Sequence, residues 1–414
     1  MTENIRLACT MVLFLFYSLV YPQSSLENLS THQSNPVGLR PVRNEVDISD
    51  LLRELFKGPQ YDQTIVQRNE KKVHTTILPA IGYALQTGLA VSLGAGIAFF
   101  TETGVQKRIS SIVTSINYTQ FKQLIFPVTA NIWTKGNKFN INLDYKFLKY
   151  PSKTYGLGAR TTDDKGYTMS FDFVKLHQTL LKQIAHGFYA GMGFYYDYFW
   201  NIKEIDPPLD FKTSFQLYGN QSKEISSGVT FKFLYDTRQN PINAKNGSFG
   251  SIVFRPNLTL FGSDNNWSSL QMEYRKYIPV SANKRNVIAL WSYNWLTIGS
   301  SKPPYLMLPS TGWDDQSNLG RGYIQGRFRA REMIYAEAEY RFGITCNDFI
   351  GGVVFVNAQS YSRYLSTQLS VIAPATGAGM RFKLNKYSNT NLSLDYAFGL
   401  HGSNGLFFNL GEVF

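Results

Sequence analysis

Charged residues, cysteines and long apolar runs are all scarce in this chain of 414 residues. Only 17% of the residues are charged, and the two cysteines are Cys9 and Cys346. No run of about twenty apolar residues, the length that a membrane-spanning helix needs, occurs outside the N-terminus. If Cys9 is removed with an export signal, a single thiol is left, which excludes an intramolecular disulfide or a zinc cluster.

Catalytic and metal-binding patterns are also missing. The histidines are His32, His74, His177, His186 and His401, and none is spaced as a metal-ligating pair. The chain has no Gly-x-Ser-x-Gly elbow. We therefore predict no enzyme and no cofactor; a Ser-His-acid triad assembled across strands stays open as an alternative, with His177 and His186 interpreted as loop or interface residues.

The N-terminus has the pattern of an export signal. Arg6 precedes an apolar run over residues 7–20, and Tyr21 begins a more polar stretch suited to cleavage. We predict a signal peptide at residues 1–23, the alternative being a buried first helix of a cytosolic protein. Residues 24–75 would then form a short periplasmic segment, in which the amphipathic stretch 46–56 either docks on the rest of the protein or frays.

Aromatic residues and glycine are abundant, with 26 Tyr, 30 Phe and 33 Gly. The mean hydropathy of −0.20 does not distinguish a soluble protein from a transmembrane β-barrel, because barrel strands alternate apolar and polar residues. The alternation of apolar and polar residues along the chain is more informative, because it marks individual strands. It predicts fifteen strands, at 89–100, 110–118, 124–133, 139–147, 167–174, 187–199, 223–235, 248–261, 268–279, 286–295, 332–342, 350–358, 376–384, 391–399 and 405–414.

These strands predict an all-β fold, a transmembrane outer-membrane β-barrel over residues 76–414. Because single-chain bacterial barrels have an even number of antiparallel strands, we expect sixteen, with the unrecognised strand near 77–84 or within 176–184. Connections alternate between short (278–287, 343–349) and long (299–331, 361–375). Short turns face the periplasm in such barrels, so the C-terminus is expected there and the 299–331 loop on the extracellular side.

The long loop contains an unusual basic stretch at residues 318–331. Four arginines, Arg321, Arg327, Arg329 and Arg331, alternate there with glycines and apolar residues. A connection of this length is functional or disordered, and apolar anchors such as Leu319 and Phe328 favour a function. The alternative is that all four arginines are exposed surface charges.

The last strand ends on an aromatic residue. Leu406, Phe408, Leu410 and Phe414 share one face in a period-two pattern, which Glu412 interrupts close to the membrane interface. We expect this face to point to lipid, and the terminal aromatic resembles the insertion signal of bacterial barrel proteins.

Three stretches together resemble the barrel domain of the BamA/TamA superfamily, the bacterial surface antigen family of outer-membrane assembly and translocation proteins. One is Arg321-Gly322-Tyr323; another runs from Asp236 through Arg238 to Pro241 and on to Gly247. The third is residues 78–83 followed by Thr87 and Gly88. The resemblance implies sixteen strands, a periplasmic turn at 236–247 and an extracellular loop folded into the lumen.

The resemblance also implies acidic partners for Arg321 on the next two strands. The first candidate is Glu339, with Glu337 on the same face and equally able to point inward. Where the family has a second acid, this chain has Asn357. We predict a weaker clamp, in which Asn357 accepts one bond from Arg321 and adds no charge.

Residues 24–75 are too few to build the periplasmic POTRA domains of the family, so we expect a short member without them. The main hypothesis is assembly or translocation of proteins through a seam between the first and last strands. Gly88, Gly94 and Gly96 would weaken the first strand at this seam, and Phe408 and Phe414 would form its other side. The alternative is a passive pore or a structural subunit of an outer-membrane complex.

The formal net charge of +12 suggests attraction to anionic lipid and lipopolysaccharide in the outer membrane of a Gram-negative cell. No nucleic-acid-binding motif accompanies the charge. Other expected partners are unfolded outer-membrane proteins or further subunits of a complex.

Overall fold

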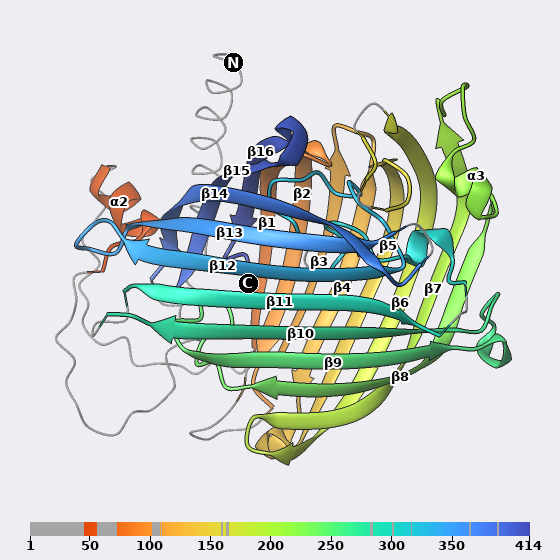
Figure 1. The fold of residues 1–414 in the computed structure, drawn as a ribbon. Coiled ribbons are helices and arrows are strands. Elements are labelled where there is room, and N and C mark those ends of the chain that lie inside the picture. Colours follow the sequence, from red (N-terminus) through yellow and green to blue (C-terminus); the bar gives the residue numbers. More distant parts are fainter. Residues whose placement is uncertain are drawn as a thin grey trace.

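Sixteen antiparallel strands in chain order form one sheet that curls into a barrel (Figure 1). The computed structural model describes residues 45–55 and 73–414, except 102–107, 109, 159, 163–164, 282–284, 300–301, 316, 364–365 and 387–388. The predicted signal peptide at 1–23 and most of the 24–75 segment lie outside the described residues. None of the helices in the described part is long and apolar enough to cross a membrane.

The strands are ordered as the alternation predicts. They are β1 (Val73–Ala84), β2 (Gly88–Phe99), β3 (Ser110–Thr119), β4 (Leu124–Trp133), β5 (Phe139–Thr154), β6 (Tyr167–Ala185), β7 (Phe188–Ile205), β8 (Glu224–Asp236), β9 (Gly247–Asn257), β10 (Trp267–Pro279), β11 (Val287–Ile298), β12 (Glu332–Gly343), β13 (Ile350–Ser362), β14 (Leu369–Asn385), β15 (Thr390–Gly399) and β16 (Asn404–Leu410).

The sixteenth strand is β1, the first of the two places expected for it. It pairs along its whole length with β2, and β2 pairs on its other side with β3. The seam strands are therefore β1 and β16, and assigning Gly88, Gly94 and Gly96 to the seam was wrong. The strand was hidden because Pro79 interrupts its pattern, which an edge strand tolerates since one row of its N–H groups has no ladder partner.

Burial alternates along the strands and separates two faces. On β11 the side chains of Ala289, Trp291 and Tyr293 are buried, whereas Ile288 and Leu290 between them are exposed. The largest buried cluster combines wall residues with residues of the 299–331 loop and of the C-terminus. The apolar exposed face is thus the outside of the wall, and the largest buried cluster lies in the lumen.

The longest strand, β6, includes the 176–184 stretch as a simple continuation. His177 lies in the middle of this strand and faces the lumen, so its interpretation as a loop or interface residue was wrong. Its Nε2 is 2.8 Å from Asp197 Oδ2, and its ring stacks on Tyr195. Lumenal polar residues broke the expected pattern, which is why the strand was predicted to end at residue 174.

The helix α2 (Ile48–Leu55) docks at one end of the barrel, opposite the end that carries α3 (Ser214–Tyr218) (Figure 1). The main-chain N–H of Val46 donates to the carbonyl of Asn347, and Lys386 contacts both Asp47 and Asp50. The amphipathic stretch therefore docks on the β12–β13 and β14–β15 turns.

The C-terminal tail, residues 411–414, leaves the wall and enters the lumen. β16 ends at Leu410, and Gly411 has a φ of 95°, a conformation that favours glycine. Phe414 is buried against Trp291, with ring centroids 5.0 Å apart. Placing Phe414 on the lipid face was therefore wrong, because the turn at Gly411 breaks the period-two pattern that the earlier residues follow.

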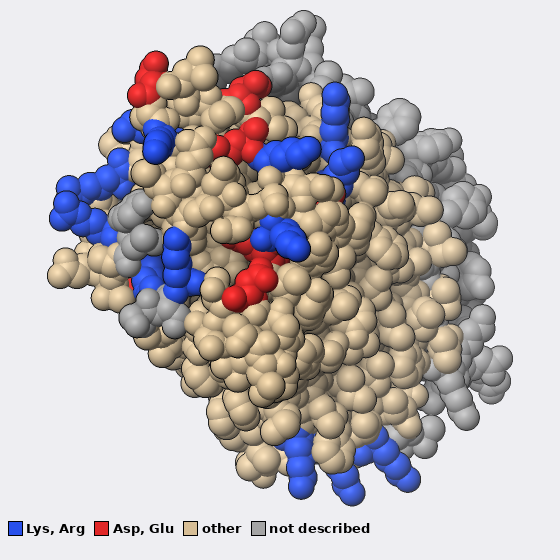
Figure 2. Space-filling model, turned by 90° about the vertical axis from the view of Figure 1, so that its right-hand side faces the viewer, with Lys and Arg blue, Asp and Glu red and all other residues tan. Residues whose placement is uncertain are grey.

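Figure 2 looks onto the end of the barrel that carries α3. Uncharged atoms cover most of this face, and Lys and Arg side chains gather in several groups, one of which projects from its edge. Asp and Glu side chains lie beside the groups at the top and centre of the view, whereas the group at the lower edge is basic alone (Figure 2).

Candidate functional site

The lumen loop, residues 299–331, connects β11 to β12 through the inside of the barrel. Leu319, Tyr323 and Phe328 are buried in the lumenal core, as the apolar anchors predict. Gly320 and Gly322 have φ values of 82° and 103°. These left-handed residues turn the chain sharply on both sides of Arg321, so that its side chain points at the barrel wall.

The Arg321 guanidinium meets three carboxylates on two strands. Its Nη1 donates to Asp395 Oδ2 on β15 at 2.5 Å, and its Nη2 donates to both Glu337 and Glu339 on β12. The Arg321 side chain is only 2% exposed. Glu337 and Glu339 are two residues apart on β12, so their side chains lie on the same face of the strand and both contact Arg321.

Burial alone would lower the pKa of Arg321, but the neighbouring Glu337, Glu339 and Asp395 carboxylates hold that pKa well above its usual value. The guanidinium carbon also lies 3.6 Å from the ring centroid of Phe355, which adds a cation–π contact. Arginine suits this site because its planar guanidinium carries several N–H donors and can bind more than one carboxylate at once.

The predicted role of Asn357 was wrong in two respects. Its Nδ2 donates to the main-chain carbonyl of Arg321 at 2.9 Å, so Asn357 is a donor to the backbone and does not accept from the guanidinium. The remaining acid is Asp395, which pairs across the sheet with Gly379. A Cβ at Gly379 would overlap the Asp395 carboxylate. The missing side chain therefore gives Asp395 room, and three acids replace the weak clamp that we expected.

Asp395 could have been found by following the alternation of its strand. It is in phase with Asn391 and Ser393, which are buried lumen-facing residues of β15. It lies on the fourth strand after the loop, beyond the two strands on which the resemblance implies acids.

An alternating chain of arginines and acids extends from Arg321 to the C-terminal tail. Arg341 binds Glu339 at 2.6 Å and donates to the main-chain oxygen of Phe414. Arg381 binds Asp395 at 2.5 Å and Glu412 at 2.8 Å. The loop tip and the C-terminal tail are therefore parts of one ionic network in the lumen, which we name the Arg321 network.

Gly322 and Tyr323 seat the loop tip against β14 and β15. A Cβ at Gly322 would lie 2.6 Å from the Ala375 Cβ. The Tyr323 hydroxyl donates to the Pro374 carbonyl at 2.7 Å and accepts from the main-chain N–H of Leu400. The tip thus approaches the wall so closely that only glycine fits.

The other side of the loop reaches the opposite wall. Gln325 accepts a hydrogen bond from the Tyr150 hydroxyl on β5, and Asp315 lies 2.8 Å from Lys175 on β6. The Asp315 side chain is 81% exposed, so water screens this ion pair far more than the buried Arg321 pairs. The loop spans the lumen with one buried and one solvated ionic anchor.

The remaining arginines of the loop are also buried, which contradicts the alternative that they are surface charges. Arg327 donates to the side chain and carbonyl of Thr161, and Arg329 donates to the carbonyls of Tyr305 and Leu306. Arg331 donates to the Gly299 carbonyl. Arg321 differs from these three because acids on two strands surround it.

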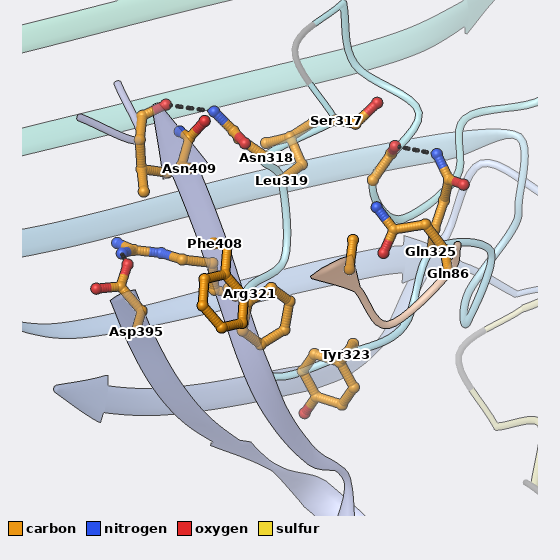
Figure 3. Close-up of a pocket in the computed structure, with 14 residues that line it drawn as sticks. Gln86, Ser317, Asn318, Leu319, Arg321, Tyr323, Gln325, Asp395, Phe408 and Asn409 are labelled. Atoms are coloured by element: carbon orange, nitrogen blue, oxygen red, sulfur yellow. Dashed lines mark hydrogen bonds and ion pairs between the residues drawn. The ribbon is translucent and has the colours of Figure 1, made fainter. Parts of the chain in front are cut away.

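A cavity of about 60 Å³ lies between the loop tip and the seam (Figure 3). Arg321 and Asp395 line one side, and Phe407 and Phe408 of β16 line another. At the outer edge the rings of Tyr83 on β1 and Phe408 are 6.2 Å apart and nearly perpendicular. The described residues include no hydrogen-bond ladder between β1 and β16.

The motif at residues 236–247 lies in the turn between β8 and β9. Arg238 makes two bonds to the Asp236 carboxylate, at 3.0 and 2.9 Å, and stacks over Phe249. Gly247 has a φ of 94° at the start of β9, whereas Pro241 is exposed at the turn. The Asn243 amide donates to the Asn389 carbonyl in the β14–β15 turn. The turn therefore reaches across one mouth of the barrel.

Residues 85–414 match the Omp85 superfamily domain. The chain belongs to the Omp85 superfamily. The outer-membrane location follows from this membership. Together with the sixteen strands of the sheet, it confirms the fold class and location predicted from the strand pattern. None of the curated proteins gives a sequence match to this Omp85 barrel.

Solved structures share the Omp85 fold. BamA from Haemophilus ducreyi lacking POTRA domains 1–3 is 15% identical with a TM-score of 0.53, and the match covers 81% of this chain and 68% of that one. CdiB from Acinetobacter baumannii is 13% identical with a TM-score of 0.52, covering 83% and 60%. CdiB from Escherichia coli is 11% identical with a TM-score of 0.54, covering 83% and 63%.

Within the described residues no group of three or more His, Cys, Asp or Glu side chains is arranged to hold a metal ion. The arginine-rich site is suited to holding protein segments together by charge.

Proposed function

We propose that this Omp85 barrel aids the assembly of proteins in the outer membrane or their translocation across it, and that the β1–β16 seam is the moving part. The two relatives named BamA and CdiB support a role of this class, since both share the barrel fold. The Arg321 network holds the lumen loop and the wall next to the seam together while the seam opens.

One observation carries this proposal: the last strand is short and has no ladder to the first. β16 has seven residues against twelve in β1, and the C-terminal tail turns away into the lumen. Unpaired strand edges present free N–H and C=O groups that can template another strand. The seam is thus the weakest junction of the wall and offers an edge to a client strand.

The filled lumen argues against the alternative of a passive pore. The loop residues Leu319, Tyr323 and Phe328 pack with wall residues and with Phe414 in the core of the barrel. Solute passage would require that this core come apart, whereas seam opening leaves most of it in place.

The test is a reversible lock on the seam. Cysteines replace Tyr83 and Phe408 in a Cys346→Ala background, and a reducible thiol-specific linker joins them in cells where this variant is the sole copy. Cysteines at Leu290 and Ala338, which are cross-strand partners in a stable ladder, provide the control.

We expect the linked seam to lower the amounts of other outer-membrane proteins, and reduction to restore them, while the linked control pair changes nothing. Unchanged protein amounts with the seam linked would reject the proposal. If depletion of the whole protein lowers small-solute uptake and leaves the other outer-membrane proteins unchanged, the passive pore is the correct function.

A further inference from the structure

The outer face of the wall carries a furrow across β8 to β11 that the seam and the lumen loop do not explain. It encloses about 320 Å³, within the range of roughly 300–1,000 Å³ typical of small-molecule sites. Tyr235 and Tyr274 flank it and are 41% and 50% exposed. We name it the membrane-side furrow.

Gly250 forms the floor of the furrow, paired with Tyr235 on β8 and Tyr274 on β10. A Cβ there would lie 3.8 Å from the Tyr274 ring, which is an ordinary contact, and the backbone of this strand residue needs no positive φ. Neither conformation nor crowding within the protein therefore demands glycine. A glycine of this kind in a strand interior often marks close approach of a ligand.

Two polar residues interrupt the apolar outer face at the β11 side of the furrow. The Asn294 amide donates to the Ser292 hydroxyl at 3.2 Å, and both residues line the furrow. Polar groups facing hydrocarbon are costly unless they find partners. A ligand with ester carbonyls would accept the second amide hydrogen of Asn294.

A cation stands at the end of the furrow nearer the β8–β9 turn. Lys276 follows Tyr274 on the same face of β10, and its Nζ donates to Ser248 Oγ at 3.1 Å. That bond holds the ammonium against the wall, where two further donors of the group can meet a phosphate. The last strand ends here, and the long 299–331 connection lies at the opposite end, so this end is assigned to the periplasmic leaflet.

We propose that the membrane-side furrow binds one diacyl phospholipid of the periplasmic leaflet. Lys276 contacts its phosphate, Asn294 and Ser292 meet the ester region, and an acyl chain lies over Gly250 between the two tyrosines. The proposal is independent of the seam. A lipid held here would fix the depth of the β8–β11 wall in the membrane.

The test measures retention of phosphatidylglycerol by the purified, delipidated barrel in neutral detergent, using native mass spectrometry. We expect Lys276→Gln to weaken the tightest binding event by about fivefold, the effect of one cation near an anionic surface. Lys276→Arg keeps the charge and is expected to retain the lipid. Lys149→Gln removes an exposed lysine from β5 and provides the matched control.

Gly250→Leu fills the furrow without removing charge and is expected to weaken binding as well, while heat-dependent migration on a gel shows that each variant is folded. Equal retention by the Lys276→Gln and Lys149→Gln variants would overturn the site. Retention of lipid A in place of phosphatidylglycerol would overturn the phospholipid as its occupant.

Discussion

The guanidinium of Arg321 is buried with three acids, so replacing Arg321 would leave buried negative charges without their partner and lower the stability of the barrel. Removal of one partner from a buried ion pair costs about 3–5 kcal/mol, because the other charge stays in a poor solvent. Arg341 and Arg381 offset part of the negative charge through Glu339 and Asp395. Among the described loop residues, Arg321 is the one that pairs with these acids.

We predict that Arg321→Ala lowers the heat and detergent resistance of the barrel far more than Arg329→Ala does. Arg329 donates only to carbonyls, which water can solvate after the loss. Heat-dependent migration on a gel measures the temperature at which each barrel unfolds. Equal effects of the two substitutions would show that Arg321 has no special role.

Asn357→Asp, which introduces the second acid that the family resemblance led us to expect, is predicted to destabilise the barrel. Asn357 donates to the Arg321 carbonyl, and a carboxylate there would lose the donor and add charge beside Glu337, its cross-strand partner. The unfolding temperature should fall at least as far as in Asn357→Ala. A higher temperature than in the unchanged protein would mean that Asn357 serves the guanidinium after all.

At the scale of elements, the C-terminal tail acts as an extension of the loop clamp and not as the end of a wall strand. Glu412 faces both Arg381 and Arg341, and the Asn391 amide donates to it. The turn at Gly411 makes this possible. Sealing β16 fully against β1 would compete with these lumenal contacts.

Glu412→Gln is therefore predicted to destabilise the barrel by about 1.5–3 kcal/mol, the contribution of a hydrogen bond to a charged group. Combined with Arg321→Ala it should show less than the sum of the two effects, because both groups belong to one network. Chemical denaturation in detergent measures the free energies. Strict additivity would indicate that the tail and the loop are held independently.

At the scale of the whole molecule, the lumen is occupied, although sixteen strands can enclose a water-filled channel. The loop contacts β5 and β6 on one side and β12 and β15 on the other. The loop therefore crosses the lumen from one wall to the other.

We predict low conductance for the intact protein in planar bilayers and a several-fold higher conductance after residues 302–331 are replaced by a short linker. Arg321→Ala should give intermittent openings, because it removes the buried ionic anchor of the loop and leaves the solvated Asp315–Lys175 pair, which is weaker. Identical conductance of the intact and loop-deleted proteins would mean that the loop does not close the lumen.

The sequence by itself determined the barrel, because alternation of apolar and polar residues reports which side of a wall each residue faces. The contact between Arg321 and Glu339 was implied by the resemblance of the loop motif to a known family, and the structure contains it. Tertiary structure decided the rest. Asp395 became the third acid because Gly379 makes room for it, and Phe414 entered the lumen because Gly411 turns the chain. Such choices depend on space between strands distant in sequence, which no local pattern records.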